Sequence, residues 1–154
     1  MWENPAYARY LSIFRKILHM GRRASYVVIL DEFEKVLLLK YAKKPEYPML
    51  EHKFVIPGGG AEAGELPEET GKRETYEETG INLEALSKIY EGIVEFYSKD
   101  YDVTIFASRK PPGDIKISPE HEAYIFGDRH ELDGIDFADI HIKDWIQMAY
   151  EMLG

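Results

Sequence analysis

Three glutamates, Glu74, Glu77 and Glu78, stand three and four positions apart in a stretch of sequence that is typical of a helix. An α-helix turns by about 100° per residue, so these side chains fall within roughly a 100° arc of one face. Like charges at this spacing repel one another, and a cation among them relieves the repulsion. Hard cations such as Mg²⁺ prefer oxygen ligands. For the helix alone, a solvated acidic face paired with basic neighbours such as Lys72 and Arg73 is the favoured interpretation, and a metal site is the alternative that its position in the chain supports.

A glycine-rich turn precedes this acidic segment. Residues 57–60 read Pro-Gly-Gly-Gly, and glycine permits backbone angles and close approaches that other residues cannot make. The helix is predicted over residues 66–79, because Pro67 suits a first helical position and Gly80 suits a helix end. Glu65 lies between the turn and the helix, where it could brace the loop.

Together these residues resemble the signature of the MutT-like Nudix hydrolases. That signature has a glycine, a glutamate, an Arg-Glu pair, an aliphatic residue, a Glu-Glu pair, a glycine and a second aliphatic residue at fixed intervals. The one departure is Thr75, which replaces the first aliphatic residue and bears on packing under the helix rather than on chemistry. Over residues 59–81 the chain matches the other positions with Gly59, Glu65, Arg73, Glu74, Glu77, Glu78, Gly80 and Ile81.

The resemblance implies a site that binds Mg²⁺ or Mn²⁺ against a substrate diphosphate. Glu77 and Glu78 would be direct metal ligands, and Glu74 would be a third acidic ligand or water-bridged partner. Arg73 would orient these carboxylates, and Glu65 would support the loop. The backbone of Gly58 and Gly59 would add a contact to the cofactor or to a phosphate.

The reaction also needs a general base, and two residues are candidates. Glu78 lies in the signature helix, whereas Glu120 precedes a predicted strand at residues 123–126, where many Nudix enzymes carry an additional acidic residue that also binds the metal. Glu122 is a further possibility, and an exposed polar turn is the alternative reading of this segment. His121 is expected to be a surface residue rather than a proton carrier.

The composition limits the classes of partner and compartment. No stretch approaches the roughly 18 consecutive apolar residues of a membrane span, and no signal peptide is expected. The formal charge of −9 argues against nucleic acid as a partner. A chain without cysteine is compatible with the reducing cytoplasm, and any metal must take oxygen or imidazole ligands.

Hydrophobic periodicity predicts an α/β fold, namely an α/β/α sandwich on a mixed β-sheet. Helices are expected over residues 5–19 and 140–153, a hairpin over 24–30 and 36–39, and strands over 54–56, 87–97 and 101–108. The loop over residues 43–53 is long enough to be functional or simply an insertion. We expect a single domain over residues 1–154, with residues 1–22 as an N-terminal helical extension, and the terminal helices leave a homodimer open.

The substrate is poorly encoded. The resemblance implies hydrolysis of a nucleoside diphosphate derivative, with nucleoside triphosphates expected first. Dinucleoside polyphosphates, nucleotide sugars and a non-catalytic nucleotide-sensing module are the alternatives. Aromatic residues could stack on a base or belong to the core, and they include Phe54, Phe96, Tyr97 and Tyr101.

Overall fold

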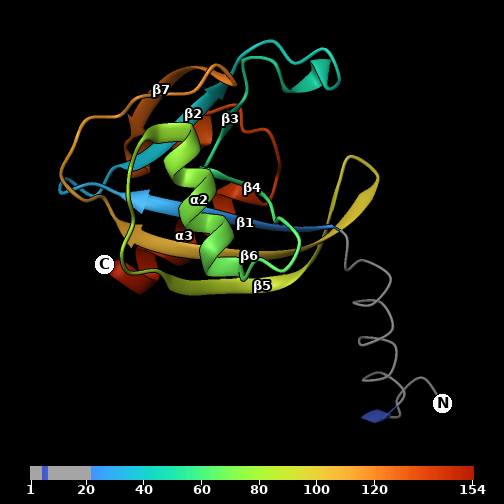
Figure 1. Ribbon diagram of the computed structural model, residues 1–154. Coiled ribbons are helices and arrows are strands. Elements are labelled where there is room, and N and C mark those ends of the chain that lie inside the picture. Colours follow the sequence, from blue (N-terminus) through green and yellow to red (C-terminus); the bar gives the residue numbers. More distant parts are fainter. Residues whose placement is uncertain (1–4, 7–21) are drawn as a thin grey trace.

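The computed structural model describes residues 5–6 and 22–154 (Figure 1). The helix predicted over residues 5–19 and the extension predicted over residues 1–22 therefore lie outside the described residues, apart from Pro5, Ala6 and Arg22. Within the described part of the chain, no helix combines the length and the apolar character that crossing a membrane requires.

Seven strands form one mixed sheet in the described part of the chain. The strand β1 lies at its centre, parallel to β6 along its whole length, whereas the other paired strands run antiparallel. The main order is β3-β2-β1-β6-β5, with β4 paired to β1 and β7 paired to β2. The strands are β1 (Arg23–Leu30), β2 (Val36–Tyr41), β3 (Phe54–Val55), β4 (Gly58–Gly60), β5 (Ser87–Phe96), β6 (Lys99–Arg109) and β7 (His121–Gly127).

The predicted hairpin between the first two strands exists only at its tight end. Leu30 and Val36 form the single paired register between β1 and β2. Beyond that point β2 diverges from β1 and pairs with β7 and β3. The edge of β1 that faced β2 pairs instead with the glycine strand β4, through Ala24 to Tyr26. Because β2 diverges, the glycine-rich segment pairs directly with the central strand β1.

Helices cover both faces of the sheet (Figure 1), with α2 (Pro67–Thr79) on one and α3 (Ile142–Leu153) on the other. Successive side chains of a strand point to opposite faces. Accordingly Tyr26 stacks on Trp145 of α3, whereas Val27 lies against Gly71 of α2. The described loops also contain the short 3-10 helices η1 (Pro48–Leu50) and η2 (Arg129–Gly134). The prediction of an α/β/α sandwich on a mixed sheet is confirmed.

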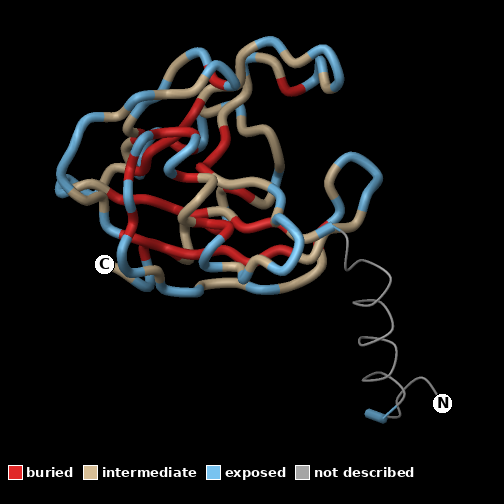
Figure 2. The backbone as a smooth tube through the Cα atoms, in the orientation of Figure 1, coloured by how far each residue is buried: buried red, intermediate tan, exposed pale blue. Residues whose placement is uncertain are grey.

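The core lies between the central strands and the two helices (Figure 2). On the α3 side it is apolar, and Trp145, Ile146 and Ala149 are buried there. The buried face of α2 is instead largely polar, with Thr70, Thr75, Glu78 and Thr79. This helix is therefore fixed by specific polar contacts more than by apolar burial.

Thr75 is the position at which the signature expects an aliphatic residue. Its side chain is fully buried, and its hydroxyl Oγ1 has no hydrogen-bond partner among the described residues. Thr79, one turn later, is equally buried, but its hydroxyl donates to the Thr75 carbonyl at 2.6 Å and accepts from the Ile81 amide at 3.2 Å. A buried hydroxyl without a partner costs free energy, whereas a satisfied one does not.

We expect Thr75→Val to raise the free energy of unfolding by about 1 kcal/mol, because valine has the same shape and removes the unsatisfied hydroxyl. The matched change Thr79→Val should lower it by about 1–2 kcal/mol, since it abolishes two hydrogen bonds. Urea unfolding of the three proteins measures both effects. Equal destabilisation by the two substitutions would show that the Thr75 hydroxyl is satisfied.

Candidate functional site

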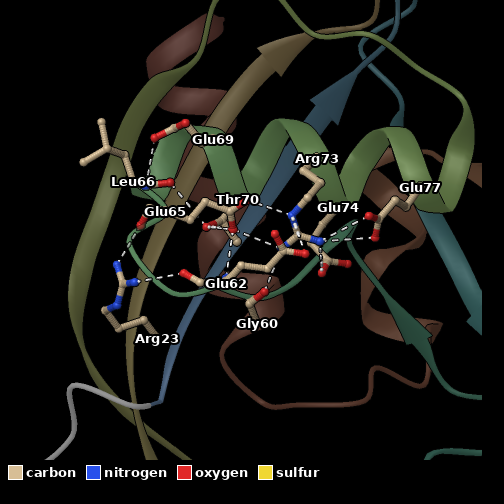
Figure 3. Close-up of polar contacts among 10 residues, drawn as sticks. All are labelled: Arg23, Gly60, Glu62, Glu65, Leu66, Glu69, Thr70, Arg73, Glu74 and Glu77. Carbon is tan, nitrogen blue, oxygen red and sulfur yellow. Dashed lines mark hydrogen bonds and ion pairs between the residues drawn. The ribbon is translucent and has the colours of Figure 1, made fainter.

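Arg73 joins the acidic helix to the glycine turn (Figure 3). Its guanidinium binds both oxygens of Glu65, with Nε to Oε2 at 2.7 Å and Nη2 to Oε1 at 3.0 Å. Nη1 donates to Glu74 at 2.9 Å and to Glu77 at 3.2 Å, and Nη2 donates to the Gly60 carbonyl at 2.9 Å. Planar two-point binding of a carboxylate fixes a guanidinium in orientation as well as in position. The pKa of Arg73 is raised, chiefly by Glu65.

Glu65 is the other half of this anchor. Its carboxylate also accepts from the Thr70 hydroxyl at 2.7 Å and from the Glu62 amide at 3.1 Å (Figure 3). These contacts, and the one to Arg73 above all, lower the pKa of Glu65 to about 2. Arg23 of β1 donates to the Glu65 carbonyl at 2.9 Å. The loop between turn and helix is thus tied to both α2 and the central strand.

Glu78 is buried beneath the glycine turn, with its side chain 7% exposed. Its Oε1 accepts from the Gly58 amide at 2.8 Å. Burial raises the pKa of the carboxyl well above its usual value, and the nearby charges of Glu120 and Glu74 add to the rise. Gly58 has φ of +153°, and a Cβ there would lie 2.3 Å from the Ser25 carbonyl oxygen. Only glycine lets the turn approach β1 and present its amide to Glu78.

Glu74 lies on the same side of the helix, also under the turn. Its side chain is 17% exposed. Burial raises the pKa of this carboxyl, although the hydrogen bond from Arg73 opposes the rise. A Cβ on Gly59 would lie 2.7 Å from the Glu74 carboxyl carbon, so this glycine makes room for the carboxylate. Two poorly solvated carboxylates, Glu74 and Glu78, therefore face the glycine strand.

Glu77 has a different environment. Its side chain is 55% exposed, and both of its oxygens accept from Arg73. In this arrangement Glu77 lies toward solvent and is not part of the cluster of Glu78, Glu120 and His121 that is described below. Its role as a metal ligand stays a prediction.

The segment before β7 completes the site. Tyr41 of β2 pairs with His121 instead of Glu122, because the register between the two strands shifts after Lys40. A bulge of this kind re-aims the side chains beside it. His121 is buried, with 3% exposure, and its ring stacks on Tyr41 at 5.1 Å between centroids. The expectation of a surface histidine is wrong, because the bulge turns the imidazole inward.

Glu120 and Glu122 point in different directions as a result. Glu122 lies on the surface and binds His52, at 2.5 Å between Oε1 and Nδ1. Glu120 faces the site, where its Oε1 accepts from Lys44 Nζ at 2.8 Å. Lys44 comes from the long loop, whose backbone is tied to the same segment by the bond from the Ala42 amide to the Glu120 carbonyl at 3.1 Å. The structure thus brings Glu120, not Glu122, to Glu78.

The residues of this cluster fit a divalent cation. Glu78, Glu120 and His121 each offer one ligand atom, and these atoms lie within 4.8 Å of one another. Buried carboxylates are costly unless they are paired or coordinate a metal. Arg73 is engaged by Glu65, Glu74 and Glu77, and among the described residues Lys44 is the cationic side chain that contacts this cluster, through Glu120. A divalent cation would offset the charge of these carboxylates.

A cavity of about 410 Å³ opens beside the cluster. Glu74, Glu120 and the strand Gly58–Gly60 line one side of it. Phe96, Tyr97 and Tyr101, which the sequence singled out, also line it, whereas Phe54 does not. The wall also includes residues that the sequence did not indicate, among them Tyr26, Tyr41, Lys44, Tyr47, Leu50, Lys99, Asp139 and Trp145. The length of the loop over residues 43–53 was the one available signal for Lys44, Tyr47 and Leu50.

Comparisons with known proteins identify the family and the fold of this chain. The family model described as the NUDIX domain matches residues 20–147. The MutT protein from Methanosarcina mazei Go1 is 23% identical with a TM-score of 0.72, over 86% of this chain and 96% of that one. A C. elegans Ap4A hydrolase complex is 21% identical with a TM-score of 0.70, over 86% and 97%. The NUDIX domain of Shewanella oneidensis NrtR, complexed with ADP ribose, is 15% identical with a TM-score of 0.73, over 96% and 98%.

The chain therefore belongs to the NUDIX domain family. The expectation of a Nudix-type pyrophosphohydrolase, an enzyme that acts on acid anhydrides, is confirmed at the level of this family.

The anchor between Arg73 and Glu65 should make stability depend on acid pH. The folded-state pKa of Glu65, about 2, lies below the ordinary value of 4.5, so its contribution is complete above about pH 4.5 and is lost as pH falls toward 2. We expect Glu65→Gln to lower the free energy of unfolding by about 2–3 kcal/mol at pH 7. The difference from wild type should shrink at pH 3, as measured by urea unfolding at both pH values. A difference that is the same at both would show that the carboxylate charge of Glu65 does not stabilise the fold.

Proposed function

We propose that this protein hydrolyses a diphosphate linkage in a nucleoside diphosphate derivative, with nucleoside triphosphates as the first substrates to test. The observation that carries the proposal is that Glu74 and Glu120 line an aromatic cavity and that Glu78 is buried close enough to both for their charges to raise its pKa. The acidic end suits a cation and the phosphates that it binds, and the aromatic walls suit a nucleobase. The same cavity would thus bind both the phosphates and the base of a nucleotide.

The proposed cofactor is Mg²⁺ or Mn²⁺, held by Glu74, Glu77, Glu78 and Glu120. When bound, such a cation neutralises phosphate oxygens and makes a water molecule more acidic. The backbone of Gly58 and Gly59 would lie against the cofactor or a phosphate, since glycine lets the chain approach closely. Arg73 would hold Glu74 and Glu77 in place through the bonds described above.

Two carboxylates remain candidates for the general base, and the structure distinguishes their surroundings. The side chain of Glu120 is 40% exposed, whereas that of Glu78 is 7% exposed. Glu120 is therefore the more accessible to incoming water, and we favour it as the proton acceptor. Glu78 would act by holding the cofactor, with its orientation fixed by the Gly58 amide.

Nucleoside triphosphates are favoured over larger substrates because the cavity, at about 410 Å³, is at the lower end of small-molecule sites. One similar structure is named as a MutT protein, another as an Ap4A hydrolase, and a third was complexed with ADP ribose. A dinucleoside polyphosphate is the second candidate, because Tyr47 and Tyr97 lie in contact at the wall, at 6.5 Å between centroids, and could hold a further base. Nucleotide sugars remain an alternative.

A nucleotide-sensing module without catalysis is the alternative from another class. It is less favoured because all the signature acids are present.

We further propose that residues 1–154 form one domain, in which residues 1–22 are an N-terminal helical extension. We also propose a cytoplasmic location, and a nucleotide as the partner rather than nucleic acid or a membrane. The sequence leaves a homodimer open, and size-exclusion chromatography would show whether the protein forms one.

Replacement of Glu78 tests the proposed chemistry. Wild type and Glu78→Gln are incubated with Mg²⁺ and a panel of nucleoside triphosphates, dinucleoside polyphosphates and nucleotide sugars, and the phosphate-containing products are measured. We expect the variant to lose at least about a hundredfold in kcat, because the change removes a metal ligand or base. Glu68→Gln, the same change at an exposed position on the first turn of α2, is the control and should match wild type. Equal rates in Glu78→Gln and wild type would refute the assigned role.

Replacement of Tyr47 tests the proposed base pocket. Stacking of a base on an aromatic ring contributes about 1–3 kcal/mol, so Tyr47→Ala should raise KM by about tenfold and leave kcat near wild type. Tyr124→Ala, on the exposed side of β7 and outside the cavity, should change neither value. Steady-state kinetics on the best substrate of the panel gives both constants. If KM is unchanged in Tyr47→Ala, the base does not stack on this wall.

A further inference from the structure

His121 is a buried polar side chain without a partner. Its ring lies against Tyr41 of β2 and near Glu78 of α2, and neither Nδ1 nor Nε2 has a hydrogen-bond partner among the described residues. Burial lowers the pKa of this imidazole to about 4, so the ring is neutral in neutral solution. Buried polar groups are usually satisfied, and an exception indicates a bound water, an ion or a functional role.

The surroundings of the ring point to an ion. His121 Nε2 lies 3.8 Å from Glu78 Oε2, which is too long for a hydrogen bond. Two ligands of one cation with bonds of about 2.0–2.2 Å can lie up to roughly 4 Å apart, so both atoms can share an ion. Glu78 Oε1 is already engaged by the Gly58 amide, which leaves Oε2 for this purpose. Glu120 belongs to the same group of residues, in which one ligand atom from each of the three lies within 4.8 Å of the others.

The ring is also held in a fixed orientation. It stacks on Tyr41 with 26° between the planes, and the His121 amide donates to the Ser118 carbonyl at 3.1 Å. The Ser118 amide in turn donates to the carbonyl of Glu78 itself, at 3.1 Å. The chain around His121 is therefore linked by the backbone to the helix end that carries Glu78. A ligand held on rigid elements loses little entropy when it binds a metal.

We propose that His121 is an imidazole ligand of the metal centre, together with Glu78 and Glu120, and that the centre consequently prefers Mn²⁺, Co²⁺ or Zn²⁺ to Mg²⁺. The preference follows from donor chemistry, because imidazole suits transition metals whereas Mg²⁺ takes oxygen ligands and water. This inference rests on the proposed function for the location of the metal. It adds a nitrogen donor to a set of carboxylates.

The decisive measurement uses the wild-type protein loaded with Mn²⁺. Pulsed electron paramagnetic resonance detects the coupling between Mn²⁺ and a directly bound nitrogen, and ¹⁵N labelling of histidine alone identifies the residue type. We expect one histidine nitrogen coupled to the ion in wild type. Mn²⁺ bound without such a coupling would overturn the inference, whatever any variant does.

Substitution then identifies the histidine and measures its effect. In His121→Leu, which fills the space of the ring with an apolar side chain, we expect loss of the nitrogen coupling and weakening of Mn²⁺ binding by about tenfold or more, as measured by calorimetry. Mg²⁺ binding should change much less, so the Mn²⁺ preference should fall. His130→Gln, an exposed histidine in η2, is the control and should keep both affinities. An unchanged ratio of affinities in His121→Leu would contradict the proposal.

Folding of the variant is checked by urea unfolding without metal. His121→Leu should be at least as stable as wild type, because it removes an unsatisfied polar ring from the core. The two proposals also fail separately. Nitrogen-coupled Mn²⁺ with no hydrolysis of any nucleotide would count against the proposed function alone, whereas hydrolysis with all-oxygen coordination would count against the histidine ligand alone.

Discussion

The ion pair between Arg73 and Glu65 is the contact on which the rest of the site depends. The glycine strand has no side chains of its own to pack, so its position relative to α2 is set by polar contacts. Arg73 reaches the strand through the Gly60 carbonyl and the loop through Glu65, and with its remaining donors it aligns Glu74 and Glu77. The same side chain thus sets the geometry of the backbone and balances part of the acidic charge. Its two-point contact with Glu65 gives it the fixed orientation that both tasks need.

The buried charge that remains explains several otherwise costly features. Glu78 lies in the core side of α2, where an apolar residue would add more to stability, and His121 is buried beside it without a hydrogen bond. Both features destabilise the protein without metal. They are consistent with a centre that is completed by a cation, so that the free energy lost in folding the site is recovered on binding. The polar face of α2, with its three buried threonines, belongs to the same arrangement.

Much of this arrangement follows from the sequence, and the remainder depends on tertiary contacts. Turn signals and periodicity predict six of the strands, helices over residues 66–79 and 140–153, and the side of α2 on which the acids lie, whereas Gly58–Gly60, for which they predict a turn, forms the strand β4. Periodicity could not show that β1 leaves β2 after one pair, since that depends on which distant strand takes its edge. Similarly, nothing local distinguishes Glu120 from Glu122 or marks His121 as buried, because a register shift opposite Tyr41 decides which side chain turns inward. Lys44 and Tyr47 line the cavity because of the path that their loop takes, and local sequence does not predict that path.

The parallel pairing of β1 with β6 has a consequence for how the molecule is assembled. Arg23 pairs with Asp102, so the central strand can pair with its parallel neighbour only after the 78 residues between them have been made. Contacts between such distant segments are slow to form, because a long loop must close first. The helix that carries the acids lies inside that loop. During synthesis on a ribosome, therefore, the residues of the proposed centre that lie early in the chain would emerge well before β6, the strand that pairs with β1 beneath them.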